Sequence, residues 1–274
     1  MTPYLALAFD LDGTLLGPDD RISERNLAAI RRAHVAGMQV VVASARWFTF
    51  ASEAAAQLTE AGVPVTGPAV ACSGAQVRRI FDGTDLFDQR LPLEFAQALA
   101  AYCDARRCVA WAALAEEIVV KMDGPARGDL PHGMRQTASL TKTLSDVAPR
   151  MLLVQGSDAC AEIEADLAPS WADRVRFVES FSGTGKRILT LTAQGADKGS
   201  ALRVACEDLG IEASSVVAFG DAENDLEMFR VAGASVAMGQ ASDHVKSEAT
   251  YISAAGHEDG VAQGIDRLLN LGEL

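Results

Sequence analysis

The 274-residue sequence contains no apolar run that approaches the roughly 20 residues of a transmembrane helix. Its first residues, Met-Thr-Pro-Tyr, lack a basic segment, and Asp10 interrupts the first apolar run, so we expect no signal peptide. The five cysteines include no CxxC pair and are odd in number, which is typical of reduced thiols in a chain of this length. These absences predict a soluble, cytoplasmic protein.

Basic residues are also scarce, with 24 lysines and arginines against 37 aspartates and glutamates and a formal net charge of −13. This excess argues against nucleic acid or an anionic membrane as the main partner. Any phosphate-binding site must therefore be locally positive, through a metal ion or through individually placed Lys and Arg side chains. The length allows one large α/β domain or two smaller ones and leaves the oligomeric state open.

The chain is organised around its first strand, where the apolar residues 5–9 run directly into Asp10 and Asp12 and then into Gly13. Residues two apart in an extended strand project from the same face, so we expect the two carboxylates to point together out of the strand end. Like charges at that distance repel unless a proton or a cation separates them, and oxygen ligands suit Mg²⁺. The plainer interpretation is a buried strand that ends in a polar turn.

The following residues alternate between the two kinds of secondary structure. A helix is predicted after the N-cap Ser23 and up to Gly37, then a strand over 38–43, a helix over 48–61 and a strand over 69–72. This alternation predicts an α/β fold with a doubly wound, Rossmann-like parallel sheet.

In such sheets ligands bind beyond the carboxyl ends of the strands. Asp10, Ser44 and Ser73 all lie at those ends.

The pattern changes after residue 80. Residues 81–185 read as an inserted α+β domain, with residues 1–80 and 186–274 forming the core. A hairpin is predicted around Asp82-Gly83, a flexible connection at 182–185, and a strand at 188–192 is assigned to the returning core.

Four carboxylates then follow core strands. Asp10 can attack phosphorus and form an aspartyl-phosphate, and Asp12 is placed to protonate the leaving oxygen and later to accept a proton from water. Asp221 ends a predicted strand and is a candidate third oxygen ligand of Mg²⁺. Asp225, four residues on, would share a helix face with it and support the metal shell.

Phosphate binding is assigned to residues at helix starts and strand ends. Lys198 opens a predicted helix, where the backbone N–H groups already favour anions, and it would neutralise both Asp10 and the transferring phosphoryl group. Ser44 would donate a hydrogen bond to a phosphoryl oxygen. Two interpretations of Arg46 stay open: a contact with phosphate or substrate, or a simple pair with a surface carboxylate.

These segments together resemble the haloacid dehalogenase superfamily, and within it the Cof-type phosphatases, which carry a cap domain inserted after the third strand. FDLDGTLL resembles the family's first motif, and RISERNLAAIRRAHVAGMQVVVASAR resembles the segment through its second. ADKGSALRVACEDLGI resembles the lysine segment, VVAFGDAENDLEMF the acidic fourth motif, and VAMGQAS and EDGVAQGI the closing segments. The series is in the family's order and covers most of the core.

The resemblance implies a role for each matching residue. The implied nucleophile is Asp10 and the implied acid/base is Asp12. Mg²⁺ would be held by Asp10, the backbone of Asp12, and Asp221, with Asp225 and Asn224 in support. Phosphate or substrate contacts are implied for Asp10, Ser44, Ala45, Arg46, Ser73, Lys198 and Asn224.

Three positions depart from the family pattern. The usual Thr-Gly-Arg is here Ser44-Ala45-Arg46, the usual Asn after the third strand is Ser73, and Gln240 replaces the usual Asn after Met-Gly. No catalytic carboxylate is lost.

The sequence thus predicts a Mg²⁺-dependent phosphatase that acts on a small phosphorylated metabolite, either a sugar phosphate or a phosphorylated cofactor. The insert would choose the substrate and exclude water. Three alternatives stay open: a phosphotransferase or mutase that uses the same residues, a non-catalytic protein that binds a phosphorylated metabolite, and a carbon–halogen hydrolase on the same fold.

Overall fold

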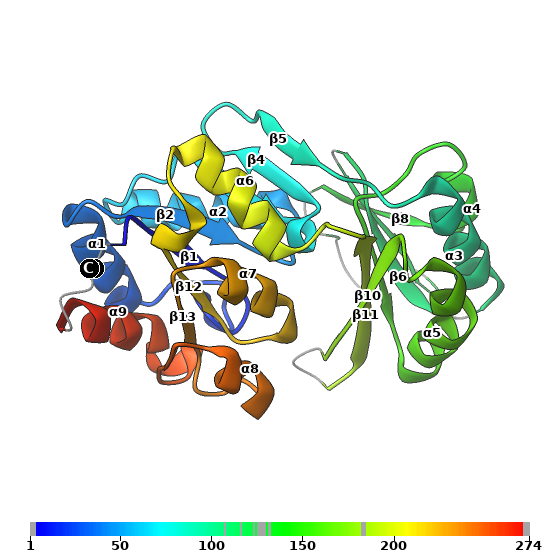
Figure 1. Cartoon of the computed structure of the whole chain (residues 1–274). Coiled ribbons are helices and arrows are strands. Elements are labelled where there is room, and N and C mark those ends of the chain that lie inside the picture. The colour runs from blue at the N-terminus through cyan, green and yellow to red at the C-terminus, as the bar shows by residue number, and fades with distance from the viewer. Residues whose placement is uncertain are drawn as a thin grey trace. The chain divides into compact units, whose positions relative to one another are not determined.

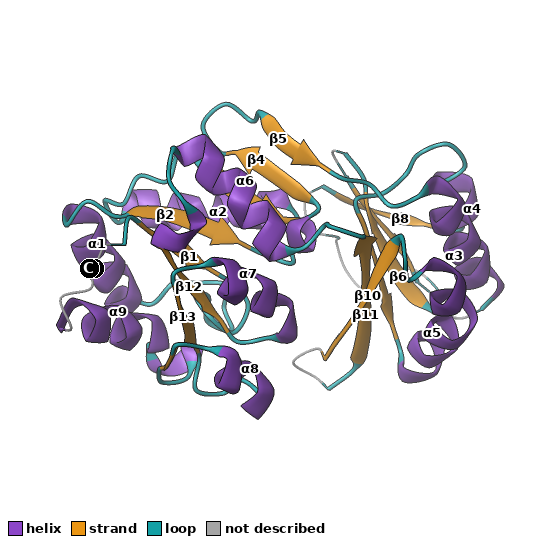
Figure 2. Cartoon of the chain, viewed as in Figure 1, coloured by secondary structure: helices purple, strands orange, loops and turns teal. Residues whose placement is uncertain are grey.

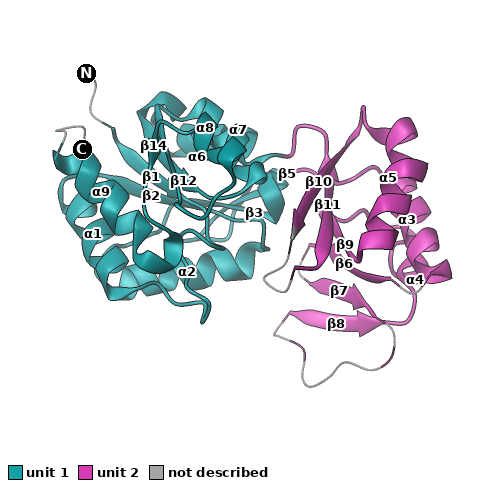
Figure 3. Ribbon diagram, turned by 90° about the horizontal axis from the view of Figure 1, so that it is seen from below, with its two compact units in different colours: residues 1–87, 197–274 teal, residues 88–196 magenta. Residues whose placement is uncertain are grey.

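The structure is a computed structural model that describes residues 4–106, 108–115, 117–122, 124, 130, 133–181 and 185–270. It divides into two compact units, coloured separately in Figure 3. One consists of Met1–Phe87 and Asp197–Leu274, and the other is the continuous stretch Asp88–Ala196. The insert therefore begins and ends later than the boundaries of 81 and 185 expected from the sequence.

The first unit is built on an eight-stranded sheet (Figure 2). Six adjacent strands, β14, β13, β12, β1, β2 and β3, run parallel to one another, and β4 is antiparallel to β3. The spatial order is β14(Tyr251–Ile252), β13(Ala234–Ala237), β12(Val216–Gly220), β1(Ala6–Phe9), β2(Gln39–Ala43), β3(Pro68–Ala71), β4(Gln76–Arg79) and β5(Asp85–Asp88).

Helices cover both faces of this sheet, and the alternation along β1 shows how. Leu7 and Phe9 pack into one apolar cluster, and Ala6 and Ala8 pack into another on the opposite face. The first cluster is closed by α1(Glu24–Val35), α2(Phe48–Glu60) and α9(Gly260–Asn270), and the second by α6(Lys198–Leu209), α7(Leu226–Val231) and α8(Asp243–Glu248). The predicted doubly wound α/β fold is confirmed.

Residues 88–196 hold a six-stranded sheet with helices on one face (Figures 1 and 3). Its order is β10(Val175–Phe181), β11(Arg187–Ala193), β9(Met151–Gln155), β6(Val109–Ala113), β7(Ile118–Lys121) and β8(Met134–Thr137). Neighbours are antiparallel except β7 and β8. Residues such as Phe95, Leu152 and Ile163 form the core between the sheet and α3(Leu93–Ala105), α4(Leu140–Thr143) and α5(Ser157–Trp171).

Two strand assignments from the sequence are wrong. Strand β5 extends the first sheet, although it was expected in the insert, and β11 belongs to the second sheet instead of the core. A local pattern predicts that a segment is a strand, but its partner strand is set by contacts distant in the sequence. Of the flexible connection expected at 182–185, residues 182–184 lie outside the described residues. Among the described helices, none has both the length and the apolar character needed to cross a bilayer.

Arg150 is the most deeply buried arginine among the described residues of the second unit, at 3% exposure. Its guanidinium donates to the Asp88 carboxylate at 2.7 Å and to the carbonyls of Leu114 and Ala115 at 2.9 and 2.8 Å. Arg90 also pairs with Asp88, at 2.9 Å, but is one-third exposed. Burial raises the pKa of Asp88, and hydrogen bonds from Arg150 and Arg90 outweigh this and lower it.

We expect Arg150→Met to lower the free energy of unfolding by about 2–4 kcal/mol, because it leaves a carboxylate and two carbonyls without their buried donor. The matched change Arg90→Met should cost less than about 1 kcal/mol, since that pair is more exposed. Urea denaturation followed by tryptophan fluorescence measures both, because Trp111 and Trp171 lie in this unit. The lowered pKa of Asp88 means that the ion-pair part of the difference is present at neutral pH and is lost in acid. Equal effects of the two changes would contradict this.

Candidate active site

The polypeptide turns sharply just beyond β1. The strand ends at Phe9, the Asp10 N–H donates to the Phe219 carbonyl of β12 at 2.9 Å, and the Asp10 side chain is buried. Gly13 follows with φ of +80°, and a Cβ there would lie 2.4 Å from Oδ2 of Asp221. Only glycine permits this approach, because any side chain would be both strained and in collision with the carboxylate. The turn thus brings the ends of β1 and β12 together.

Lys198, the first residue of α6, places its ammonium in the middle of the site. It is almost fully buried, and its Nζ donates to Oδ1 of Asp10 at 2.5 Å and to Oδ1 of Asp225 at 2.6 Å. Asp197 caps the helix by accepting from the Ser200 N–H at 2.8 Å. The next residue, Gly199, allows close packing on α7, since a Cβ there would lie 2.3 Å from the Glu227 carbonyl oxygen.

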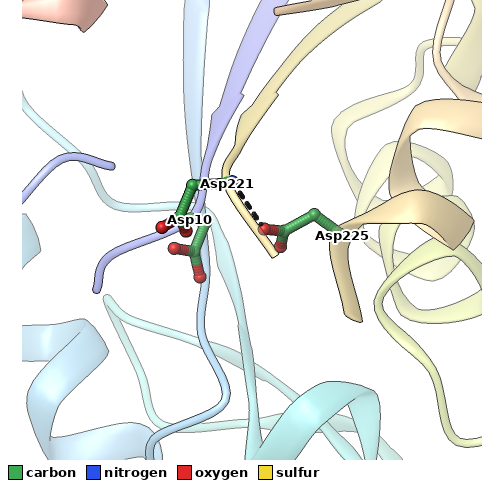
Figure 4. Close-up of side chains that lie close together, drawn as sticks. All are labelled: Asp10, Asp221 and Asp225. Carbon is green, nitrogen blue, oxygen red and sulfur yellow. Dashed lines mark hydrogen bonds between the residues drawn. The ribbon is translucent and has the colours of Figure 1, made fainter. Parts of the chain in front are cut away.

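Asp225 connects the lysine to the loop after β12. Its Oδ2 accepts from the N–H groups of Asp221 and Ala222, each at 3.0 Å, and the first of these bonds is the dashed line in Figure 4. Both of its oxygens are therefore already engaged by protein donors. Asp10, Asp221 and Asp225 each offer a carboxylate oxygen within 4.8 Å of the others.

Burial dominates the electrostatics of these carboxylates. It raises the pKa of Asp10 well above its ordinary value, against the effect of Lys198 and with help from Asp225 and Asp221. It raises the pKa of Asp221 to about 6, with Asp225 adding to the effect. For Lys198, burial lowers the pKa, but the charges of Asp10 and Asp225 outweigh it and the pKa is raised. The lysine therefore stays protonated.

A divalent cation fits this donor set. Three carboxylates and one ammonium leave an excess of two negative charges in a buried space, which a 2+ ion would cancel. The donors are all oxygens, which suits Mg²⁺ better than softer metals. Because both oxygens of Asp225 are engaged, Asp10 and Asp221 are the side chains that remain for direct ligation.

The loop after β3 brings Ser73 to Ser44. The Ser73 N–H donates to the Ser44 carbonyl at 3.2 Å, and the Ser44 hydroxyl accepts from the Arg46 N–H at 2.9 Å, which leaves its own proton for another acceptor. Ser73 has a left-handed backbone, with φ of +55°, and is 5% exposed. Among the described residues nothing hydrogen-bonds its hydroxyl. A strained residue with an unpartnered buried hydroxyl suggests a ligand contact.

Asp12 lies beyond the end of β1, in the turn that follows the strand. Since β1 ends before Asp10, the alternation of an extended strand does not reach residue 12. The half-exposed Asp12 carboxylate is held by Arg46, whose Nε donates to it at 2.8 Å and whose Nη2 also contacts it. Nη1 of the same arginine lies 2.8 Å from Asp20, and its guanidinium stacks over Phe50. Arg46 is therefore paired with surface carboxylates in this structure.

The remaining expected residues lie on the loops beside these groups. Ala45 lies in the turn after β2, and Asn224 lies in the short 3-10 turn Glu223–Asp225 that precedes α7. Three contacts at the site were not predicted from the sequence. The Thr14 hydroxyl donates to Asp221 at 3.5 Å, and the Gln240 amide donates to Asp221 at 3.0 Å. Asp20 pairs with Arg46. Thr14 lies inside the first motif, but no local signal marked Asp20.

A family model described as haloacid dehalogenase-like hydrolase matches residues 7–265. The chain belongs to this family. The resemblance expected from the sequence motifs is thus confirmed, and with it a hydrolase of the phosphatase type, because curated relatives of this hydrolase are named as phosphatases.

One such relative is the 5-amino-6-(5-phospho-D-ribitylamino)uracil phosphatase YwtE of Bacillus subtilis, 28% identical with 96% of this chain and 98% of the relative covered. Another is the HMP-PP phosphatase of Cronobacter sakazakii, 27% identical with 91% and 89% covered. Among solved structures, TM0651 from Thermotoga maritima superposes with a TM-score of 0.78, at 26% identity and with 96% of this chain and 97% of that chain covered.

Ser73→Ala should make the hydrolase more stable and a weaker binder of phosphate. Removing an unpartnered buried hydroxyl should raise the free energy of unfolding by about 1 kcal/mol, whereas a lost hydrogen bond to a phosphoryl oxygen should weaken phosphate binding by roughly 3–10-fold. Thermal unfolding by circular dichroism and calorimetric titration with inorganic phosphate measure the two effects.

Ser235→Ala is the matched control for this prediction. Ser235 is also a buried serine, but its hydroxyl accepts from the Thr250 N–H at 3.0 Å. Its replacement should lower stability and leave phosphate binding unchanged. A destabilised Ser73→Ala with wild-type phosphate affinity would show that the hydroxyl has a structural role instead.

Proposed function

We propose that this hydrolase is a Mg²⁺-dependent phosphatase that cleaves a small phosphorylated metabolite through an aspartyl-phosphate on Asp10. The observation that carries the proposal is the buried contact of Asp10 with Lys198 beside two further carboxylates. A buried carboxylate that faces an ammonium and a cation site is suited to receive a dianionic phosphoryl group, because both positive charges offset the repulsion.

The proposed reaction has two steps. In the first, an Asp10 oxygen attacks phosphorus, the bond from phosphorus to the ester oxygen breaks, and Asp12 gives that oxygen a proton. In the second, Asp12 takes a proton from water, whose oxygen attacks the aspartyl-phosphate and releases phosphate and the Asp10 carboxylate. Asp12 must leave its contact with Arg46 to do this, and Arg46 is then available to the substrate.

The other residues bind and orient. Lys198 and the hydroxyls of Ser44 and Ser73 would hold phosphoryl oxygens, together with Ala45, Arg46 and Asn224 around the ligand. Asp10, the backbone of Asp12, and Asp221 would hold Mg²⁺, with Asp225 fixing the Asp221 backbone. Bound Mg²⁺ would supply charge neutralisation of the phosphoryl group.

The substrate class rests on the relatives. Two relatives are named as phosphatases of 5-amino-6-(5-phospho-D-ribitylamino)uracil and of HMP-PP, and on this basis we propose a sugar phosphate or a phosphorylated cofactor as the substrate of this chain. The insert, residues 88–196, is the proposed source of specificity.

Asp10→Asn should lower phosphate release at least about a thousandfold, because an amide cannot act as the nucleophile. The assay is phosphate release from p-nitrophenyl phosphate and from a panel of sugar phosphates and phosphorylated cofactors, with Mg²⁺ or with EDTA. EDTA should abolish wild-type activity. Asp266→Asn is the matched control, since this exposed carboxylate pairs with Arg32 on the surface, and its activity should stay within about twofold of wild type.

The same assay separates the alternatives. Transfer to an added sugar hydroxyl without phosphate release would identify a phosphotransferase, and halide release from a haloacid in EDTA would identify a dehalogenase. Tight phosphate binding with no turnover of any ester would identify a binding protein. Asp10→Asn with wild-type phosphatase activity would refute the proposed mechanism.

A further inference from the structure

Gln240 links three separate segments beside the acidic cluster through one side-chain amide. Its Nε2 donates to the Gly13 carbonyl at 2.6 Å and to Oδ2 of Asp221 at 3.0 Å, and its Oε1 accepts from the Gly256 N–H at 3.0 Å. The Gly13 carbonyl and the Asp221 carboxylate can only accept, so they must face the amide nitrogen. The Gly256 N–H can only donate, so it must face the amide oxygen. The orientation of the amide is therefore fixed by its partners.

The segments that Gln240 joins are packed too closely for other side chains. A Cβ on Gly256 would lie 2.1 Å from the Gly13 carbonyl oxygen, and a Cβ on Gly13 would lie 2.4 Å from Oδ2 of Asp221. The loop after β1, the loop before α9 and the end of β12 thus meet at one point. The Gln240 amide supplies the hydrogen bonds between them.

The length of the side chain matters for this contact. The family pattern has Asn at this position, and Gln is one methylene longer, which adds about 1.5 Å of reach. The longer side chain lets a single amide donate to both Gly13 and Asp221 while it accepts from Gly256. The departure from the family pattern therefore comes with a direct contact to a carboxylate of the cluster.

We propose that Gln240 is a positioning residue that fixes the Asp221 carboxylate for metal binding. It engages Oδ2 and leaves Oδ1 to the cation, since among the described residues the hydrogen bond to Oδ1 is the long 3.5 Å contact from Thr14. This inference rests on the proposed function, because it requires that Asp221 is a Mg²⁺ ligand. Hydrogen bonds that orient a ligating carboxylate commonly account for a 10–100-fold difference in metal affinity.

Gln240→Met tests the inference, because Met keeps the length and flexibility of Gln and removes both the donor and the acceptor. Mg²⁺ titrated calorimetrically into the metal-free full chain, without substrate, should show at least about a tenfold weaker dissociation constant. Activity should recover toward the wild-type kcat at saturating Mg²⁺, because the change affects metal affinity and leaves Asp10 and Lys198 in place. Gln240→Asn, which keeps the amide, should lie between Met and wild type.

Gln263→Met is the matched control. Gln263 lies on α9 and donates to the Glu258 carbonyl at 3.0 Å, away from Asp221, so its replacement should leave the Mg²⁺ dissociation constant unchanged. Wild-type Mg²⁺ affinity in folded Gln240→Met, or a lower melting temperature with the same affinity, would overturn the inference and leave the proposed function intact. Failure of wild type to bind Mg²⁺ would overturn both.

Discussion

The ammonium of Lys198 lies between two buried carboxylates, and the arrangement of the site depends on this contact. Without it, Asp10 and Asp225 would face each other in an apolar interior, at a cost that neither the fold nor solvent would offset. The lysine in turn needs the first turn of α6 at the sheet edge, which the cap at Asp197 and the close packing at Gly199 provide. The packing of α6 therefore determines where the positive charge of the site lies.

The same contact extends through the backbone to Asp221, which we propose as a metal ligand. Asp225 gives one oxygen to Lys198 and the other to the N–H groups that open the loop at Asp221, so the lysine fixes the loop by way of one carboxylate. From the opposite side, Gln240 and the glycines fix the Asp221 side chain. The site is thus held rigidly by groups that need not touch substrate, which is what a reaction that depends on positioning requires.

The core fold and the acidic cluster can be predicted from the sequence because each depends on short local patterns of residues. The cap at Ser23, the apolar strand before Asp10 and the helix start at Lys198 each depend on neighbouring residues, and the motif series placed them in order. The sequence assigned β5 and β11 to the wrong sheets, because the partner of a strand is set by contacts distant in the sequence. The contact between Asp12 and Arg46 and the unpartnered hydroxyl of Ser73 also required coordinates, since each depends on how two loops meet.

The excess of negative charge at the site lowers the stability of the fold but suits the binding of a cation. Burial, together with the neighbouring carboxylates, raises the pKa of Asp10 and of Asp221, so ionising these two groups without a cation costs the fold stability. A divalent cation bound at the proposed site would offset that cost, and by linkage it would stabilise the folded chain by about 2.7 kcal/mol at a hundred times its dissociation constant. The buried hydroxyl of Ser73, which has no hydrogen-bond partner among the described residues, likewise costs stability, and a hydrogen bond to a phosphoryl group would remove that cost. The groups that cost the fold stability are therefore the same groups that we propose to bind the cation and the phosphoryl group.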